Sequence, residues 1–148
     1  NVQRSGFCAI RSSEFPFGGA DLGGRYNALE ITCRSDGRPY SVNLKCESFI
    51  QGDLFQCFID IPPTIIDPLN EQDKLTGGRF DQVILLFNHF IVTSGGRVRS
   101  TQRVLDNRVK IQSIGFTLMD GINGNFQFDL ARIRAVNYDE TGVIGDVD

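Results

Sequence analysis

The sequence predicts an all-β domain, either a sandwich or a barrel. Apolar and polar side chains alternate in seven short segments, which is the pattern of strands that bury one face. Glycine is abundant at 16 residues, and with Asn, Asp and Pro it separates these segments as turn residues do. No segment carries the periodicity of a long helix. The expected strands are residues 6–12, 27–34, 39–47, 53–60, 80–87, 110–118 and 125–136.

The length of the chain suits a single domain. With 148 residues, 41% of them hydrophobic, it can bury one sizeable core. We expect this domain to span residues 1–138 and an acidic, glycine-containing tail, extended or frayed, to span 139–148. Residues 61–79 contain three prolines and predict an irregular loop, with a short helical turn near 70–75.

A hairpin is expected around Asp36-Gly37, a dipeptide that favours two-residue turns. Pairing the flanking strands across this turn produces one apolar and one polar face, so the pattern predicts the register. The apolar pairs are Leu29 with Leu44, Ile31 with Val42, and Cys33 with Tyr40. The polar residues are Glu30, Thr32, Arg34, Ser41, Asn43 and Lys45. Asp36 and Gly37 thus have a structural role as a turn, and the polar face is either a solvated surface or a ligand-binding face.

Alternation also marks the last two expected strands. Ile114, Phe116 and Leu118 share one parity, and residues 126–130 continue the pattern after a turn that includes Gly124-Asn125. Ile133 then takes the opposite parity from the earlier apolar residues. A bulge near residues 130–132 would explain the switch.

Charge and hydropathy disfavour two classes of partner. The net charge is −3 and the pI is about 5.1, whereas nucleic-acid binding usually shows a basic footprint. No run of 18 apolar residues exists, so no transmembrane span is predicted.

The four cysteines do not match a metal or redox motif. Cys8, Cys33, Cys46 and Cys57 have neither zinc-site nor C-x-x-C spacing, although two disulfides remain possible by count. Each lies in an apolar strand-like segment, which favours buried free thiols and a reducing compartment.

No catalytic, metal or cofactor site is predicted. His89 is the only histidine, and a hydrolase would have to use it, but its position beyond an apolar strand favours a surface loop. Asp67, Glu71 and Asp73 are clustered without the spacing of a calcium loop.

One basic segment interrupts this acidic chain. Its members are Arg97, Arg99 and Arg103, followed by Arg108 and Lys110. The functional interpretation is a docking patch for an acidic protein surface or for anionic lipid headgroups. The alternative is a solvated loop whose arginines pair with nearby carboxylates.

Four stretches together resemble one family. They are RSGFCAIRS (4–12), YNALEITCRSDGRPYSVNLK (26–45), GGRVR (95–99) and IQSIGFTLMDGINGNFQFDLARIRAV (111–136). In order and spacing they resemble the complex I intermediate-associated protein 30 family. Two features differ: Leu86 replaces a proline of the family, and about fifty N-terminal residues with a Gly-Gly-x-Ser strand pair do not precede this domain. The chain is therefore a fragment, a short member, or a domain completed by strands from elsewhere.

The resemblance implies a fold and a non-catalytic function. The fold would be a galactose-binding-like β-sandwich, or jelly roll, without some N-terminal strands. The function would be that of an assembly factor or accessory subunit of an organellar membrane complex, with the membrane arm of mitochondrial respiratory complex I favoured. The protein would lie peripherally on the matrix side of the inner membrane, with no cofactor. The alternatives are a photosystem assembly factor on the stromal side of plastid thylakoids and a carbohydrate-binding module that uses the polar face.

Overall fold

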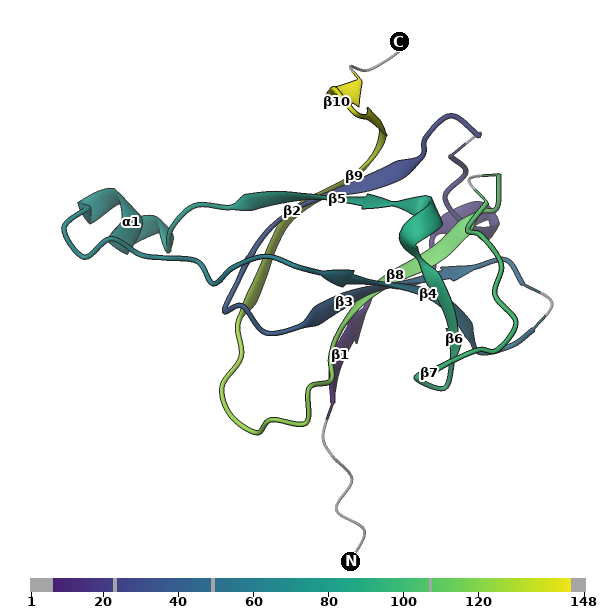
Figure 1. Ribbon diagram of the computed structural model, residues 1–148, viewed down its shortest axis with the longest axis horizontal. Coiled ribbons are helices and arrows are strands. Elements are labelled where there is room, and N and C mark those ends of the chain that lie inside the picture. Colours follow the sequence, from purple (N-terminus) through teal and green to yellow (C-terminus); the bar gives the residue numbers. More distant parts are fainter. Residues whose placement is uncertain (1–6, 23, 49, 107, 145–148) are drawn as a thin grey trace, which may run out of the picture.

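A computed structural model describes residues 7–22, 24–48, 50–106 and 108–144, and it confirms an all-β sandwich (Figure 1). Two antiparallel sheets pack face to face. The six-stranded sheet has the order β1 (Cys8–Arg11), β8 (Ile111–Leu118), β3 (Tyr40–Cys46), β4 (Asp53–Ile59), β6 (Ile91–Ser94) and β7 (Arg97–Val98). The four-stranded sheet has the order β10 (Gly142–Ile144), β9 (Phe128–Asp139), β2 (Ala28–Ser35) and β5 (Asp81–Leu86).

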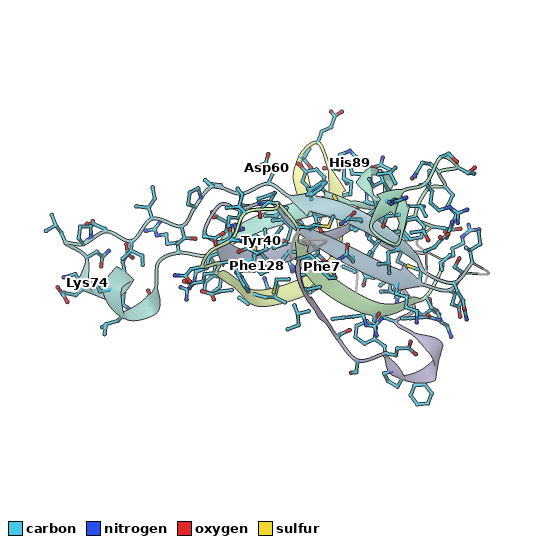
Figure 2. The ribbon with its side chains drawn as sticks, turned by 90° about the horizontal axis from the view of Figure 1, so that it is seen from below. Phe7, Tyr40, Asp60, Lys74, His89 and Phe128 are labelled. Atoms are coloured by element: carbon cyan, nitrogen blue, oxygen red, sulfur yellow. The ribbon has the colours of Figure 1, made fainter. Side chains whose placement is uncertain are left out.

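The core lies between the two sheets and contains the residues that the alternation predicts to be buried. The six apolar residues that flank the expected turn are all buried, and Phe55, Leu85 and Val92 join them. Tyr40 and Phe128 contact each other there, with ring centroids 4.8 Å apart, and Figure 2 shows both between the sheets. The parity prediction therefore holds around the expected turn, whereas Phe126 and Leu130, which the alternation places with Phe128, are exposed.

The predicted β2–β3 hairpin is wrong. β2 pairs with β5 and β9, whereas β3 pairs with β4 and β8, so the two strands lie in different sheets. Leu29 and Leu44 are buried on the facing sides of the two sheets instead of being neighbours in one. Asp36 and Gly37 still form a turn, but it leads the chain from one sheet to the other. Alternation determines which side chains are buried, and both arrangements bury the same ones.

The predicted bulge in the last long strand is confirmed. Thr32 is opposite Arg132, while Cys33 is opposite Leu130, so Ala131 is the extra residue in β9. The connection over residues 119–127 also crosses between the sheets, because β8 lies in the six-stranded sheet and β9 in the four-stranded sheet.

The remaining elements differ from expectation in extent. β6, β7 and β10 were not predicted, and β10 returns antiparallel to the end of β9, so residues 142–144 are part of the sheet. Residues 145–148 of the expected tail lie outside the described residues. The expected helical turn is α1 (Glu71–Thr76), and two 3-10 turns occur at η1 (Pro16–Gly18) and η2 (Phe87–His89). No helix in the described part is long and apolar enough to cross a membrane.

Candidate functional site

Two arginines of the basic segment converge on one buried carboxylate. Asp53 begins β4, and its side chain is only 1% exposed. Arg99 donates to both of its oxygens, at 2.9 and 3.1 Å, and Arg103 donates to Oδ2 at 3.1 Å. Arg103 also lies over the ring of Phe55, 5.1 Å from its centroid. Arg99 and Arg103 therefore anchor the segment after β7 to the sheet.

The electrostatics of Asp53 follow from these contacts. Burial opposes ionisation of the carboxyl group, but the hydrogen bonds from Arg99 and Arg103 outweigh it and hold its pKa below the ordinary value. Asp53 was not predicted as a site residue. It lies 46 and 50 residues before its two partners, so no local signal in the sequence connects them.

Arg97 and Arg108 are exposed and differ from Arg103, which is also exposed but pairs with Asp53. Neither makes an ion pair with a residue that the structure describes. Arg97 lies in the edge strand β7, and the backbone N–H of Arg108 donates to Asp106. The expected docking patch is thus reduced to these two arginines, because Arg99 and Arg103 are engaged by Asp53.

The expected polar face is divided between the two outer surfaces of the sandwich. Glu30, Thr32 and Arg34 belong to β2 in the four-stranded sheet, whereas Ser41, Asn43 and Lys45 belong to β3 in the six-stranded sheet. The prediction of one continuous face is wrong for the same reason as the hairpin: the strands do not pair.

On the four-stranded sheet, Glu30 forms an ion-pair cluster. Its buried carboxylate accepts from Arg134 Nε at 2.7 Å and Nη2 at 3.0 Å, and from Arg132 at 3.4 Å. The hydrogen bond from Arg134 is the largest influence and lowers the pKa of Glu30. These ion pairs join β2 to β9, so their role is structural.

On the six-stranded sheet, Asn43 and Lys45 line a groove of about 320 Å³. It crosses the strands from β1 to the turn after β6, with Phe7 and Met119 among its apolar residues. Asn43 donates to Thr117 Oγ1 at 2.6 Å, and Gln56 donates to Ser41 Oγ at 2.9 Å. Amides and hydroxyls of this kind hydrogen-bond neutral polar ligands.

A further polar cluster lies where two of the connections that cross between the sheets meet, the one from β2 to β3 and the one from β8 to β9. Arg38 forms a two-pronged ion pair with Asp120, at 2.7 and 2.8 Å, and also donates to the carbonyl of Ile122. Asp36 accepts from the Tyr40 hydroxyl at 3.1 Å and from the backbone N–H of Gln127 at 2.8 Å. Two sequence motifs about 80 residues apart thus bind each other at one end of the sandwich.

Loss of the Asp120 carboxylate should flatten the acid dependence of stability. The hydrogen bond from Arg38, followed by that from the backbone of Ile122, lowers the pKa of Asp120 from 3.8 to about 2. A carboxyl group with a lowered folded-state pKa stabilises the fold above its unfolded-state pKa, and this contribution is lost as pH falls from about 4 to about 2. Urea unfolding of Asp120→Asn across this range should show a smaller slope than the wild type. Asp60→Asn, at an exposed position, is the control and should retain the slope; an unchanged slope in Asp120→Asn would contradict the assignment.

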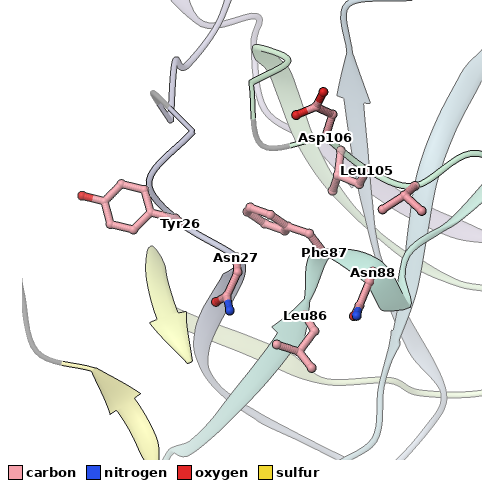
Figure 3. Close-up of a pocket in the computed structure, with 8 residues that line it drawn as sticks. Tyr26, Asn27, Leu86, Phe87, Asn88, Leu105 and Asp106 are labelled. Carbon is pink, nitrogen blue, oxygen red and sulfur yellow. The ribbon is translucent and has the colours of Figure 1, made fainter. Parts of the chain in front are cut away.

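A second cavity, of about 470 Å³, opens at another edge of the sandwich (Figure 3). Its lining includes Phe87 and Leu105 with the polar residues Asn27, Asn88 and Asp106. Asn27 both donates to and accepts from the backbone of Tyr138, and Asp106 accepts from the backbone of Arg108, so these groups hold local structure. His89 ends η2 and is not among the lining residues.

The cysteines and carboxylates form no metal centre in the described ranges. No three His, Cys, Asp or Glu side chains there are close enough to hold an ion. All four thiols are free, but only Cys33 and Cys46 are buried as expected: Cys8 is exposed and Cys57 is half-buried. Burial raises the pKa of Cys33 to about 11 and that of Cys46 to about 12, which keeps both protonated and unreactive near neutral pH.

Comparison with known proteins identifies the family. The family model for complex I intermediate-associated protein 30 (CIA30) matches residues 1–130. A Neurospora crassa relative, "Complex I intermediate-associated protein 30, mitochondrial", is 29% identical over 97% of this chain and 48% of its own length. The Mus musculus protein of the same name is 32% identical over 86% of this chain and 37% of its own length. The chain thus spans half or less of these curated relatives, and it belongs to the complex I intermediate-associated protein 30 family.

Proposed function

We propose that this protein is a non-catalytic assembly factor for mitochondrial respiratory complex I. The observation that carries the proposal is the family match over residues 1–130, which includes both motifs of the Arg38–Asp120 cluster. Both relatives are named for a complex I intermediate and as mitochondrial proteins. The protein would act peripherally, on the matrix side of the inner membrane.

The side-chain chemistry supports binding rather than catalysis. Three carboxylates with lowered pKa values, Glu30, Asp53 and Asp120, are each engaged by arginines that join strands or connections. Perturbed carboxyl groups arise in structural ion pairs as well as in active sites, and here the partners account for the shifts. The protein would therefore contribute through surface complementarity to its partners.

Association with assembly intermediates is the test of this function. Tagged full-length protein, expressed in cells that contain mitochondria, should co-migrate with incomplete complex I in native gels of detergent-solubilised membranes. Its depletion should reduce the amount of complete complex I. An accessory subunit would instead remain with the complete enzyme, and a protein that migrates only alone would contradict both versions.

The exposed cations should contribute to this association. Because a charge at the rim of an interface mainly affects encounter and salt dependence, Arg97→Glu with Arg108→Glu should reduce co-migration about fivefold to tenfold. Arg11→Glu with Arg25→Glu, an equal charge change at two exposed positions outside this segment, is the control. Equal losses in both variants would show an effect of net charge and not of this surface.

A further inference from the structure

An arm over residues 60–80 projects from the sandwich between β4 and β5 and carries α1 at its far end (Figure 1). Figure 2 shows Lys74 of α1 well away from the sandwich and at the opposite end from His89. α1 buries none of its residues. Three aliphatic side chains of the arm are almost fully exposed: Ile65 at 85%, Leu69 at 91% and Leu75 at 82%. Clustered exposed apolar groups of this kind mark interaction sites.

The base of the arm is attached firmly to β2. The Arg34 guanidinium donates to the carbonyls of Thr76 and Gly78, pairs with Asp129 at 2.7 Å, and lies 4.5 Å from the centroid of the Phe80 ring. On the outgoing side, the backbone N–H of Thr64 donates to the carbonyl of Ser35 at 2.9 Å. Both ends of the excursion are therefore held to the same strand.

The far end of the arm is shaped by its own polar contacts. Asn70 caps α1 by accepting from the N–H groups of Gln72 and Asp73, at 2.9 and 3.3 Å. Gly77 ends the helix in the left-handed conformation, with φ +83°. Asp67 accepts from the backbone N–H of Leu69 at 2.9 Å. A segment ordered in this way loses little conformational entropy when it binds.

The charges on residues 65–75, which form the tip of the arm, favour one kind of partner. Over residues 65–75 the acidic groups are Asp67, Glu71 and Asp73, and the only basic residue is Lys74, which pairs with Glu71 at 2.8 Å. Anionic membrane surfaces attract basic segments and repel acidic ones. An apolar protein groove with basic residues at its rim complements both features of the tip.

We propose that the arm tip, defined as residues 65–75, docks into an apolar groove with a basic rim on a protein partner. This inference rests on the proposed function in that the partner is expected among the subunits or assembly intermediates of complex I. Leu69 and Leu75 supply the apolar contact, and Glu71 supplies charge that the rim recognises. The Arg34 cluster holds the arm in the orientation that presents them.

Site-specific photo-crosslinking tests the contact. Benzoylphenylalanine at position 69 of the full chain, in mitochondrial membranes, should yield an adduct with one protein. The same probe at Phe17, which is 95% exposed and outside the arm, should not. Glu71→Lys should reduce the position-69 adduct about tenfold, and raised salt should do the same. The swap Glu71→Lys with Lys74→Glu, which preserves the net charge of the arm, should retain more adduct than Glu71→Lys alone.

Several outcomes would overturn the inference. The first is an adduct yield at position 69 no higher than that at position 17. The second is an adduct with a second copy of this chain. The third is an adduct whose yield Glu71→Lys does not change. Flotation with phosphatidylcholine–cardiolipin vesicles that is lost in Leu69→Ser with Leu75→Ser would show membrane docking instead.

The same double variant separates this inference from the proposed function. If it folds normally and co-migrates with complex I intermediates as the wild type does, the arm inference fails and the proposed function stands. If the charge-dependent adduct forms with a protein unrelated to complex I, the arm inference stands and the proposed function fails.

Discussion

Leu44→Ala is expected to lower the free energy of unfolding by about 2–5 kcal/mol, the range for a leucine removed from a core that relaxes only partly. Leu44 is 0% exposed and lies in β3, between Ile114 of β8 and Phe55 of β4. The measurement is urea unfolding followed by far-ultraviolet circular dichroism. A loss below about 1 kcal/mol would contradict the placement of this side chain in the core.

Leu69→Ala is the matched control for that experiment. The substitution is identical, but Leu69 is 91% exposed, so its effect on stability should stay within about 0.5 kcal/mol. This result would show that the arm does not need its apolar side chains for folding. A large loss in Leu69→Ala would place the side chain in a packed environment and would contradict its proposed availability for docking.

Gly37→Ala is expected to destabilise the fold by about 1–3 kcal/mol, because two costs coincide. Gly37 has φ +83°, which L residues rarely adopt, and a Cβ there would lie 2.8 Å from Cδ of Pro63. The change would also disturb the turn that places Asp36 and Arg38 against residues 119–127. Thermal and urea unfolding measure the loss.

Gly96→Ala separates the two costs. Gly96 has a similar φ of +79°, but an added Cβ would meet no atom within 4 Å. It should therefore carry only the backbone penalty, about 1 kcal/mol. Equal losses for Gly37→Ala and Gly96→Ala would mean that the contact with Pro63 contributes nothing.

Strand parity was the most predictable feature of this fold. Alternation identified Ile31, Val42 and Leu44 as buried, and the change of parity placed a bulge near residues 130–132, where the structure has it. The short strands β6, β7 and β10 were not predicted, because four, two and three residues show too little of a period to be recognised. The family motifs were also recognisable, since they depend on residue order alone.

The candidate site was predicted less well. The basic segment was found, but the pairing of Arg99 and Arg103 with Asp53 was not. This buried carboxylate lies 46 and 50 residues away along the chain. The arm was recognised only as an irregular loop with a helical turn. Its projection depends on the Arg34 contacts with Thr76 and Gly78, which join residues more than 40 positions apart.

By itself, the sequence determined the all-β class, most of the side chains that fill the core, the turn at Asp36-Gly37, and the family. Only the tertiary structure decided that β2 and β3 face each other across the core instead of pairing. As a consequence, the polar residues of these two strands lie on opposite surfaces of the sandwich. The physical reason is that burial depends on the side-chain period of a single strand, whereas pairing depends on which distant backbone satisfies its hydrogen bonds. Both solutions bury Leu29, Ile31, Val42 and Leu44, so the local pattern could not distinguish them.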